Sequence, residues 1–156
     1  MARLEKIYSG GKKLQDERTG RAIMQLTGWD QPSEGGYAAT NPFGLNESCC
    51  VLASKRTGRW EIYKVDIDGF EAVQLSDREG INNHSMSVSP NDKEVYYTAG
   101  MQVWAVDLQS GEERLVTDCS DVAERPAGFY VTFNDDGSKL LMQYKPHGAN
   151  SGIAVV

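Results

Sequence analysis

Three cations stand close together in the segment SKRTGRW, and they are the residues of this sequence best suited to hold a ligand. They are Lys55, Arg56 and Arg59. Guanidinium groups bind carboxylates through paired hydrogen bonds, and an ammonium group adds a point charge. The whole chain has a formal net charge of -6, so this cluster contrasts with its surroundings. We predict that the segment binds a carboxylate-bearing ligand; the alternative is a solvated hairpin loop with no ligand.

The two histidines offer a second kind of chemistry, because imidazole transfers protons and binds metal ions. His84 lies in GINNHSMS and His147 in KPHGANSG. We predict that His84 joins the three cations in a ligand-binding site, with a solvated loop as the alternative. His147 is interpreted as a surface-loop residue. Two histidines cannot supply a centre of three or four imidazoles, so no metal site is predicted within the chain.

Composition limits the partners and the compartment. An acidic chain offers no broad basic face for phosphates, which argues against nucleic acid. No stretch approaches the roughly 18 apolar residues of a membrane span, and the start MARLEKIYSGGKK holds charges but no apolar signal segment. We therefore expect a soluble, cytoplasmic protein without membrane partners. Cys49, Cys50 and Cys119 have no metal-binding or disulfide spacing and are expected to pack as small apolar side chains.

A repeat organises the chain around these candidate residues. Aligning SVSPNDKEVYY with TFNDDGSKLLM places Ser87 on Thr132 and Asn91 on Asp136, an interval of 45 residues. The same interval backwards places Val88 on Phe43. A second pair of phrases, EIYKVD and QVWAVD, repeats at an interval of 41. The difference indicates a length change in one loop, which stacked repeats tolerate.

Each unit reads as four short strands separated by turns. Pro90, Asn91 and Asp92 form a turn signal between the first and second strands, and Gly111 marks the turn before the fourth. No segment has a sustained helical period. The sequence therefore predicts an all-β protein made of four-stranded antiparallel β-propeller blades. In such blades the loop that holds the three cations and the loop that holds His84 lie at the same mouth.

The strand count gives about three blades of an incomplete propeller. We expect one partial propeller domain over 1–156, with blades at about 37–77 and 83–118 and a split blade made of 128–156 plus the strand at 20–27. Propellers close with four to eight blades. Three blades leave apolar faces uncovered, so we expect a fragment, or a subunit that associates with a second copy.

Several phrases resemble the amino-terminal blades of the oligogalacturonate lyase family, and more loosely the TolB propeller. They are LQDERTGRAIMQLT, SVSPNDKEVYYT and VWAVDLQSGEE. The resemblance covers roughly residues 14–145. It implies a seven-bladed propeller that cleaves pectic oligomers by β-elimination with a divalent metal, manganese, held by a histidine-rich cluster. The family's metal cluster and catalytic base lie in later blades, so the resemblance assigns no catalytic residue here.

The resemblance also sharpens the expected ligand and leaves an alternative. An oligouronate presents a carboxylate at every sugar, so an acidic oligosaccharide is the expected partner of Lys55, Arg56, Arg59 and His84. The family usually has a histidine beside a basic residue before the first blade, where this chain has PSEGGYAATNP. We expect a lyase-like carbohydrate-active propeller that is inactive by itself. The alternative is a non-catalytic interaction or oligomerising propeller.

Overall fold

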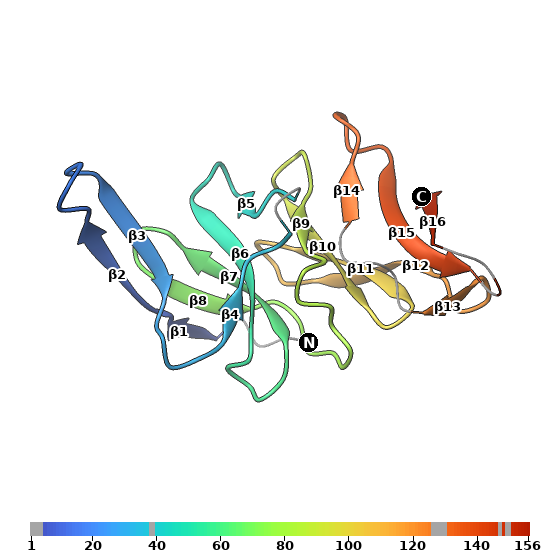
Figure 1. The fold of residues 1–156 in the computed structure, drawn as a ribbon, viewed down its shortest axis with the longest axis horizontal. Helices are drawn as coiled ribbons and strands as arrows, with labels where there is room; N and C mark the ends of the chain where they lie inside the picture. The colour runs from blue at the N-terminus through green and yellow to red at the C-terminus, as the bar shows by residue number, and fades with distance from the viewer. Residues whose placement is uncertain (1–4, 38–39, 126–130, 147, 149–150) are drawn as a thin grey trace.

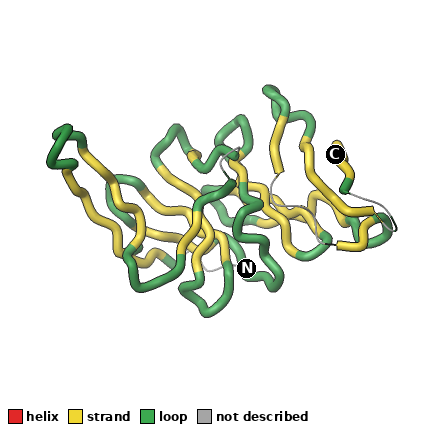
Figure 2. The backbone as a smooth tube through the Cα atoms, in the orientation of Figure 1, coloured by secondary structure: helices red, strands yellow, loops and turns green. Residues whose placement is uncertain are grey.

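The computed structural model describes residues 5–37, 40–125, 131–146, 148 and 151–156. All the regular elements in these ranges are β-strands, which confirms the all-β prediction (Figure 1 and Figure 2). The described ranges contain no helix long and apolar enough to cross a membrane. The strands form three larger sheets and one hairpin, which follow one another along the long axis of the molecule (Figure 1).

The first sheet is centred on three antiparallel strands. Its order is β1-β8-β7-β6-β4, and β5 also pairs with β6. The bounds are β1 Lys6–Tyr8, β4 Ser33–Glu34, β5 Phe43–Gly44, β6 Cys49–Ser54, β7 Glu61–Asp66 and β8 Glu71–Gln74. In the register of the central strands, Leu52 lies opposite Tyr63. Large apolar and aromatic residues suit this position, since both faces of the strands are covered.

The second and third sheets repeat the same architecture. The second has the order β12-β11-β10-β9, and the third contains β13-β15-β14 with β16 also paired to β15. The bounds are β9 Ser87–Val88, β10 Glu94–Ala99, β11 Gln102–Asp107, β12 Glu113–Asp118, β13 Ala123–Arg125, β14 Val131–Phe133, β15 Leu140–Pro146 and β16 Gly152–Val155. Strands β1, β4 and β13 lie outside the ranges predicted for the three units.

The strand at 20–27 has a different partner from the one predicted. β3 (Ala22–Thr27) pairs with β2 (Gly10–Gln15). This hairpin lies at one end of the molecule and the third sheet at the other (Figure 1). Leu26 of the hairpin packs against the first sheet at Leu52 and Tyr63. Two sheets separate β3 from residues 131–156, whereas paired strands lie about 4.8 Å apart. The predicted pairing is therefore not formed.

A recurring turn shows which part of a sheet the hairpin represents. In three places an aspartate carbonyl accepts a hydrogen bond from the backbone N–H four residues later, at N···O distances from 2.8 to 3.0 Å, and that later residue has a positive φ. The pairs are Asp16 and Gly20, Asp66 and Phe70, and Asp107 and Gly111. Because this turn joins β7 to β8 and β11 to β12, β2 and β3 correspond to the third and fourth strands of a sheet.

The turn between the first two strands of a sheet repeats as well: it joins β9 to β10 in the second sheet and β14 to β15 in the third. The Asn91 side-chain oxygen accepts a hydrogen bond from the Lys93 N–H at 3.1 Å, and Asp136 does the same for Ser138 at 2.8 Å. Asp92, in the left-handed region with a φ of 59°, follows Asn91 as Gly137 follows Asp136. Asx turns of this kind link strands without a helix. The 45-residue sequence interval therefore corresponds to a repeated backbone geometry.

Apolar side chains fill the spaces between neighbouring sheets. Alternation along a strand sends successive residues to opposite faces, so Val51 and Ala53 face the second sheet while Leu52 faces the hairpin. The buried residues of the interface between the second and third sheets are Val103, Cys119, Val131, Leu140 and Met142. Each interface is thus an independent apolar layer, as expected for stacked repeats.

The cysteines follow the predicted packing role. Cys49 and Cys119 are buried, and all three cysteines are free thiols. Burial raises the pKa of Cys49 and Cys119, and raises the pKa of Cys50 to about 11. A raised pKa keeps a thiol protonated and unreactive at neutral pH. Cys49 and Cys119 therefore act as small core side chains, and Cys50 is half-buried.

The turn aspartates predict how stability changes with pH. Hydrogen bonds from the Ser110 and Gln109 backbone N–H groups lower the pKa of Asp107. A folded-state pKa below the unfolded value of about 4 stabilises the fold above that pH, and the contribution disappears as pH falls through the folded pKa. We expect Asp107→Asn to lose less stability than the parent chain between about pH 4 and pH 2. Urea unfolding at several pH values measures this; parallel curves for the two proteins would contradict it.

Candidate functional site

Three segments meet at one edge of the first sheet, which we call the loop edge: residues 32–37, 55–60 and 75–86. The segment before β6 is fixed there because Ser33 pairs with Ser54 and Glu34 with Ala53. Beyond that pair, the Lys55 N–H donates to the Pro32 carbonyl oxygen at 3.0 Å. The β6–β7 and β8–β9 loops both lie along the lower edge in Figure 1. The four predicted ligand-binding residues all belong to these two loops.

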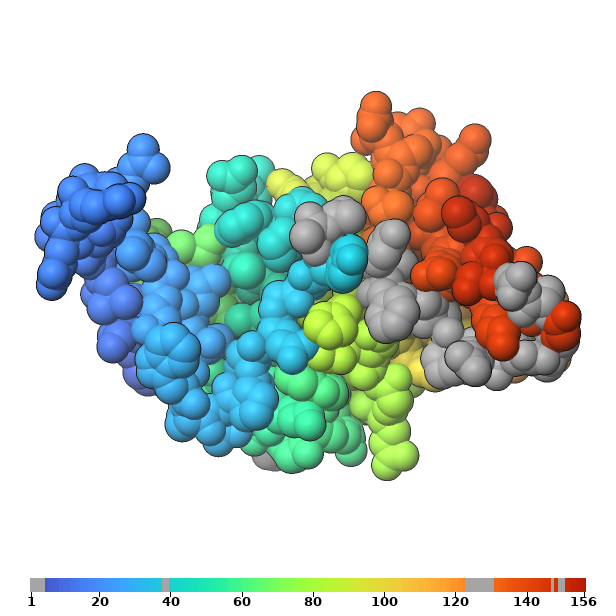
Figure 3. Space-filling model, viewed as in Figure 1, coloured from blue at the N-terminus to red at the C-terminus, as the bar shows by residue number. Residues whose placement is uncertain are grey.

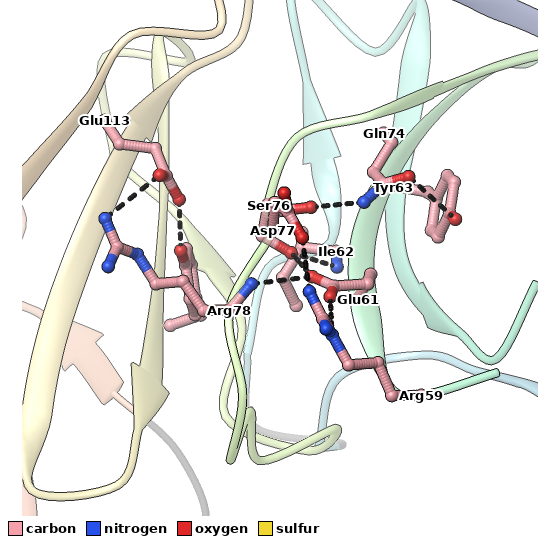
Figure 4. A network of polar contacts seen from close by, with 10 residues as sticks. Arg59, Glu61, Ile62, Tyr63, Gln74, Ser76, Asp77, Arg78 and Glu113 are labelled. Carbon is pink, nitrogen blue, oxygen red and sulfur yellow. Dashed lines mark hydrogen bonds and ion pairs between the residues drawn. The ribbon is translucent and has the colours of Figure 1, made fainter. Parts of the chain in front are cut away.

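Arg59 is held by two carboxylates (Figure 4). Its Nε donates to Glu61 at 2.5 Å, and its Nη2 contacts Asp77 across the two loops. The hydrogen bond with Glu61 is the main cause that raises the pKa of Arg59. Glu61 is fully buried while Arg59 is 44% exposed, so the guanidinium neutralises a carboxylate that would otherwise lack a countercharge. Arg59 therefore ties the two loops together and has less capacity left for a ligand.

Glu61 organises the local backbone as well. Besides Arg59, it accepts hydrogen bonds from the Ser76 hydroxyl at 2.6 Å and the Arg78 backbone N–H at 3.3 Å. Ser76 in turn accepts the Ile62 N–H at 2.7 Å. A buried charge is stable when its hydrogen-bonding capacity is filled in this way. The carboxylate of Glu61 thus fixes the start of the β8–β9 loop.

Arg78 extends this network to the second sheet. Its Nη2 donates to Glu113 at 3.1 Å, and its guanidinium carbon lies 3.3 Å from the centre of the Trp104 ring. Tyr97 donates its hydroxyl hydrogen to the same Glu113, and burial followed by this hydrogen bond raises the pKa of Tyr97. Stacking on an aromatic face suits guanidinium. Arg78 is therefore a structural link between the first two sheets.

Lys55 and Arg56 form the tip of the loop edge. The Gly58 N–H donates to the Lys55 carbonyl at 2.9 Å, and Gly58 has a φ of 91°, a conformation that glycine adopts without strain. The Lys55 ammonium lies 5.0 Å from the centre of the Trp60 ring. Arg56 donates from Nη2 to the Ser9 carbonyl at 2.5 Å. Within the described ranges neither side chain forms an ion pair; Lys55 is exposed, whereas Arg56 is half-buried and its Nε is closed to solvent.

His84 lies on the same edge but has different partners. Its Nε2 is 3.3 Å from the Glu34 carboxylate and 3.5 Å from the Asn83 side-chain nitrogen. The His84 backbone N–H donates to Asn82 at 3.1 Å. No hydrogen bond or ion pair joins His84 to the three cations in the described part of the chain. The structure thus brings Lys55, Arg56 and Arg59 together in one loop and places His84 beside Glu34; His147 lies outside the described residues.

Sequence reasoning did not identify Glu34, Glu61 or Arg78. Glu61 begins the apolar strand EIYKVD two residues after Arg59. An acidic residue at an apolar position of a predicted strand, two residues after an arginine, could have predicted an internal ion pair, because acidic residues are seldom buried without a partner. Glu34 and His84 are fifty positions apart and share no pattern, so only the fold brings them together.

A family model described as oligogalacturonate lyase matches residues 1–143. Two curated relatives agree with it. The oligogalacturonide lyase of Pectobacterium atrosepticum is 29% identical over 78% of this chain and 31% of its own length. The oligogalacturonate lyase of Dickeya dadantii is 28% identical over 72% of this chain and 29% of its own length. The aligned part is therefore about a third of each curated relative.

Solved structures give the same fold. An oligogalacturonate lyase in complex with manganese has a TM-score of 0.77 at 26% identity, over 92% of this chain and 39% of its own. An oligogalacturonate lyase from Vibrio parahaemolyticus has a TM-score of 0.79 at 19% identity, over 95% of this chain and 41% of its own. At 19% identity this second likeness supports the fold alone. The same holds for a putative TolB from Agrobacterium tumefaciens, which has a TM-score of 0.64 at 15% identity, over 94% of this chain and 56% of its own.

These matches confirm the predicted propeller architecture: the stacked antiparallel sheets of this chain cover part of β-propeller proteins. The family model spans well over half of the sequence. The chain therefore belongs to the oligogalacturonate lyase family.

Proposed function

We propose that this chain is the amino-terminal part of a propeller that acts on acidic pectic oligosaccharides, and that its loop edge contributes substrate binding. The observation that carries the proposal is that Lys55 and Arg56 form no ion pair with any residue that the structure describes, on a chain with a formal net charge of -6. They belong to the same loop as Arg59, with Lys55 over the Trp60 ring and Arg56 on the Ser9 carbonyl oxygen. A uronate carboxylate between an ammonium and a guanidinium would be held by charge-assisted hydrogen bonds. Arg59 serves this site by fixing the loop, and His84 lines its other side.

We further propose that elimination needs parts outside this chain. Removing a proton beside a carboxylate requires a base, and the resulting enolate requires a cation or strong hydrogen-bond donors. One relative is described as a complex with manganese. In the described ranges, no three His, Cys, Asp or Glu side chains gather as a metal-binding group. The residues of this chain do not fit the histidine-rich centre that the family resemblance implies, so we assign no step to a metal and expect no lyase activity from the chain alone.

Binding of trigalacturonate tests this proposal. We expect Lys55→Gln and Arg56→Gln each to weaken binding by about tenfold, because each removes a charged hydrogen-bond donor to carboxylate. Calorimetric titration measures the affinity, with circular dichroism to check the fold of Arg56→Gln, whose parent side chain also holds the Ser9 carbonyl. Lys93→Gln is the matched control, since Lys93 is exposed in the turn between β9 and β10. Equal losses in all three variants would refute a local site.

A second candidate function, self-association, is favoured by one uncovered apolar face. In the third sheet, Ile153 is 70% exposed and Val155 61% exposed. Val155 lies opposite Leu141 in the register, so an apolar strip runs across β15 and β16. We propose that a second copy covers this strip, because apolar patches of this kind mark association sites. Light scattering across a wide concentration range should show a dimer that Val155→Asp disrupts; a monomer at every concentration would exclude it.

A further inference from the structure

Trp29 lies in the segment 28–32, which joins β3 to the loop edge, and it is exposed to solvent. Its exposed fraction is 89%, the largest of any large apolar residue that the structure describes. Within the described ranges its indole has no hydrogen-bond acceptor and no aromatic or cationic partner. Tryptophan has a large apolar surface, so an indole left in water forgoes the free energy that burial supplies. A ligand that covers this ring would gain that free energy.

The backbone on both sides of Trp29 is fixed. The Gly28 N–H donates to the Ser9 carbonyl oxygen at 3.1 Å, and the Pro32 carbonyl oxygen accepts the Lys55 N–H at 3.0 Å. Trp29 therefore stands on a segment that is anchored at each end. An anchored segment loses less conformational entropy when a ligand binds, which favours affinity.

The same contacts place this segment beside the cations of the proposed sugar site. Arg56 donates from Nη2 to the Ser9 carbonyl oxygen, which is also the acceptor of the Gly28 N–H. Two donors that share one oxygen are close neighbours, so the Arg56 guanidinium lies next to the residue that precedes Trp29. Figure 3 shows the blue residues that follow β3 next to the green β6–β7 loop, along the lower edge of the visible face. An exposed indole and two cations thus lie on adjoining segments.

An indole beside cations suits an acidic sugar. The pyranose ring of galacturonate carries three neighbouring C–H groups on one face, and this apolar patch packs flat against an electron-rich aromatic face. The carboxylate projects from the edge of the ring, where a guanidinium or an ammonium can bind it. The Asp30 carboxylate lies 2.7 Å from the place that a Cβ of Gly28 would occupy, so it is turned towards the backbone. A sugar carboxylate is expected on the other side, towards Lys55 and Arg56.

We propose that Trp29 is a stacking residue for one galacturonate ring of the acidic oligosaccharide. The inference rests on the proposed function, because the cations of the β6–β7 loop hold the carboxylate while the indole covers the ring. The cations recognise charge and Trp29 recognises the apolar face of a pyranose. The two together select an oligouronate over other anions.

Affinity measurements separate the ring contact from the charges. We expect Trp29→Ala to weaken trigalacturonate binding about tenfold, and Trp29→Tyr, which keeps an aromatic face, to weaken it less. High salt should shrink the loss caused by Lys55→Gln, because salt screens charges, and should leave the loss caused by Trp29→Ala in place. Leu115→Ala is the matched control, since Leu115 is an exposed apolar residue of β12, and it should bind like the parent chain. Calorimetric titration supplies the affinities, and circular dichroism checks the fold.

Fluorescence reports contact with the ring itself. The chain has three tryptophans. Trp60 and Trp104 are half-buried, and each has a cation over its ring. Saturating trigalacturonate should protect Trp29 from quenching by acrylamide in the parent chain, and this protection should be missing in Trp29→Phe.

The stacking role and the proposed function fail in different ways. Suppose that Lys55→Gln weakens trigalacturonate binding while Trp29→Ala does not, and that acrylamide still quenches Trp29 at saturation. This result would overturn the stacking role and leave the sugar site in place. An equal loss in Leu115→Ala would also overturn the stacking role. If trigalacturonate at millimolar concentration does not bind the parent chain, both proposals are wrong.

Discussion

Replacing Glu61 by alanine is expected to lower the free energy of unfolding by about 3 kcal/mol. The change removes a fully buried carboxylate and leaves Arg59, the Ser76 hydroxyl and the Arg78 backbone N–H without their common acceptor. The partly exposed Arg59 can turn to water, which reduces the cost, but Ser76 is buried. The effect therefore comes mainly from unsatisfied groups inside the fold.

Chemical denaturation of three variants measures this contribution. Glu61→Gln keeps an acceptor oxygen and should be less destabilising than Glu61→Ala. Glu71→Ala is the control, because Glu71 pairs with Lys6 on the surface with about half of its side chain exposed, and exposed ion pairs contribute about 1 kcal/mol or less. Similar losses for Glu61→Ala and Glu71→Ala would show that Glu61 is not the organising group of the loop edge.

The second large effect concerns the interface between the second and third sheets. We expect Met142→Ala to cost about 3 kcal/mol, because Met142 is fully buried between these sheets and its removal leaves a cavity. Ile153→Ala on the neighbouring strand is the matched control, since Ile153 faces outward and should cost less than about 1 kcal/mol. The two residues belong to the same sheet but to opposite faces.

Hydrogen exchange of the backbone amides shows which sheets the Met142→Ala substitution destabilises. In stacked repeats each sheet is stabilised by its neighbours, so Met142→Ala should reduce protection in β14–β16 while the interface between the first and second sheets keeps its protection. Uniform loss over the whole chain would mean that the sheets unfold as one unit. A large effect of Ile153→Ala in the monomer would mean that its face is covered.

The sequence predicted the repeat and the turns because both depend on local residue types. Asn91 and Asp136 bond to their own backbones in the same way, and a turn motif is visible in one short phrase. The partner of β3 was not predictable in this manner. A repeat alignment shows whether a strand is the first, second, third or fourth of a sheet, but it does not show which of the sheets the strand joins. The strand GGKKLQ of β2 also lacks the apolar alternation that would have marked it.

The candidate site was predicted only in part for a similar reason. The cations of SKRTGRW are adjacent in sequence, so their clustering in one loop needed no tertiary information. The different roles of these cations depend on contacts that the fold creates. Arg59 binds Asp77 of another loop and the buried Glu61, whereas the Lys55 ammonium lies over the Trp60 ring. His84 was selected as a loop residue, but its neighbour Glu34 comes from another strand. Such pairings are set by the stacking of segments and leave no local sequence signal.

Mapping a bound ligand on the backbone amides tests most directly whether the loop edge is a binding site for acidic sugars. Trigalacturonate added to the labelled chain should shift the amide signals of Lys55, Arg56 and Trp60, and then those of the His84 loop, while neutral maltotriose leaves them in place. Shifts confined to the outer face of the third sheet, equal shifts with both sugars, or none at millimolar trigalacturonate would contradict the account.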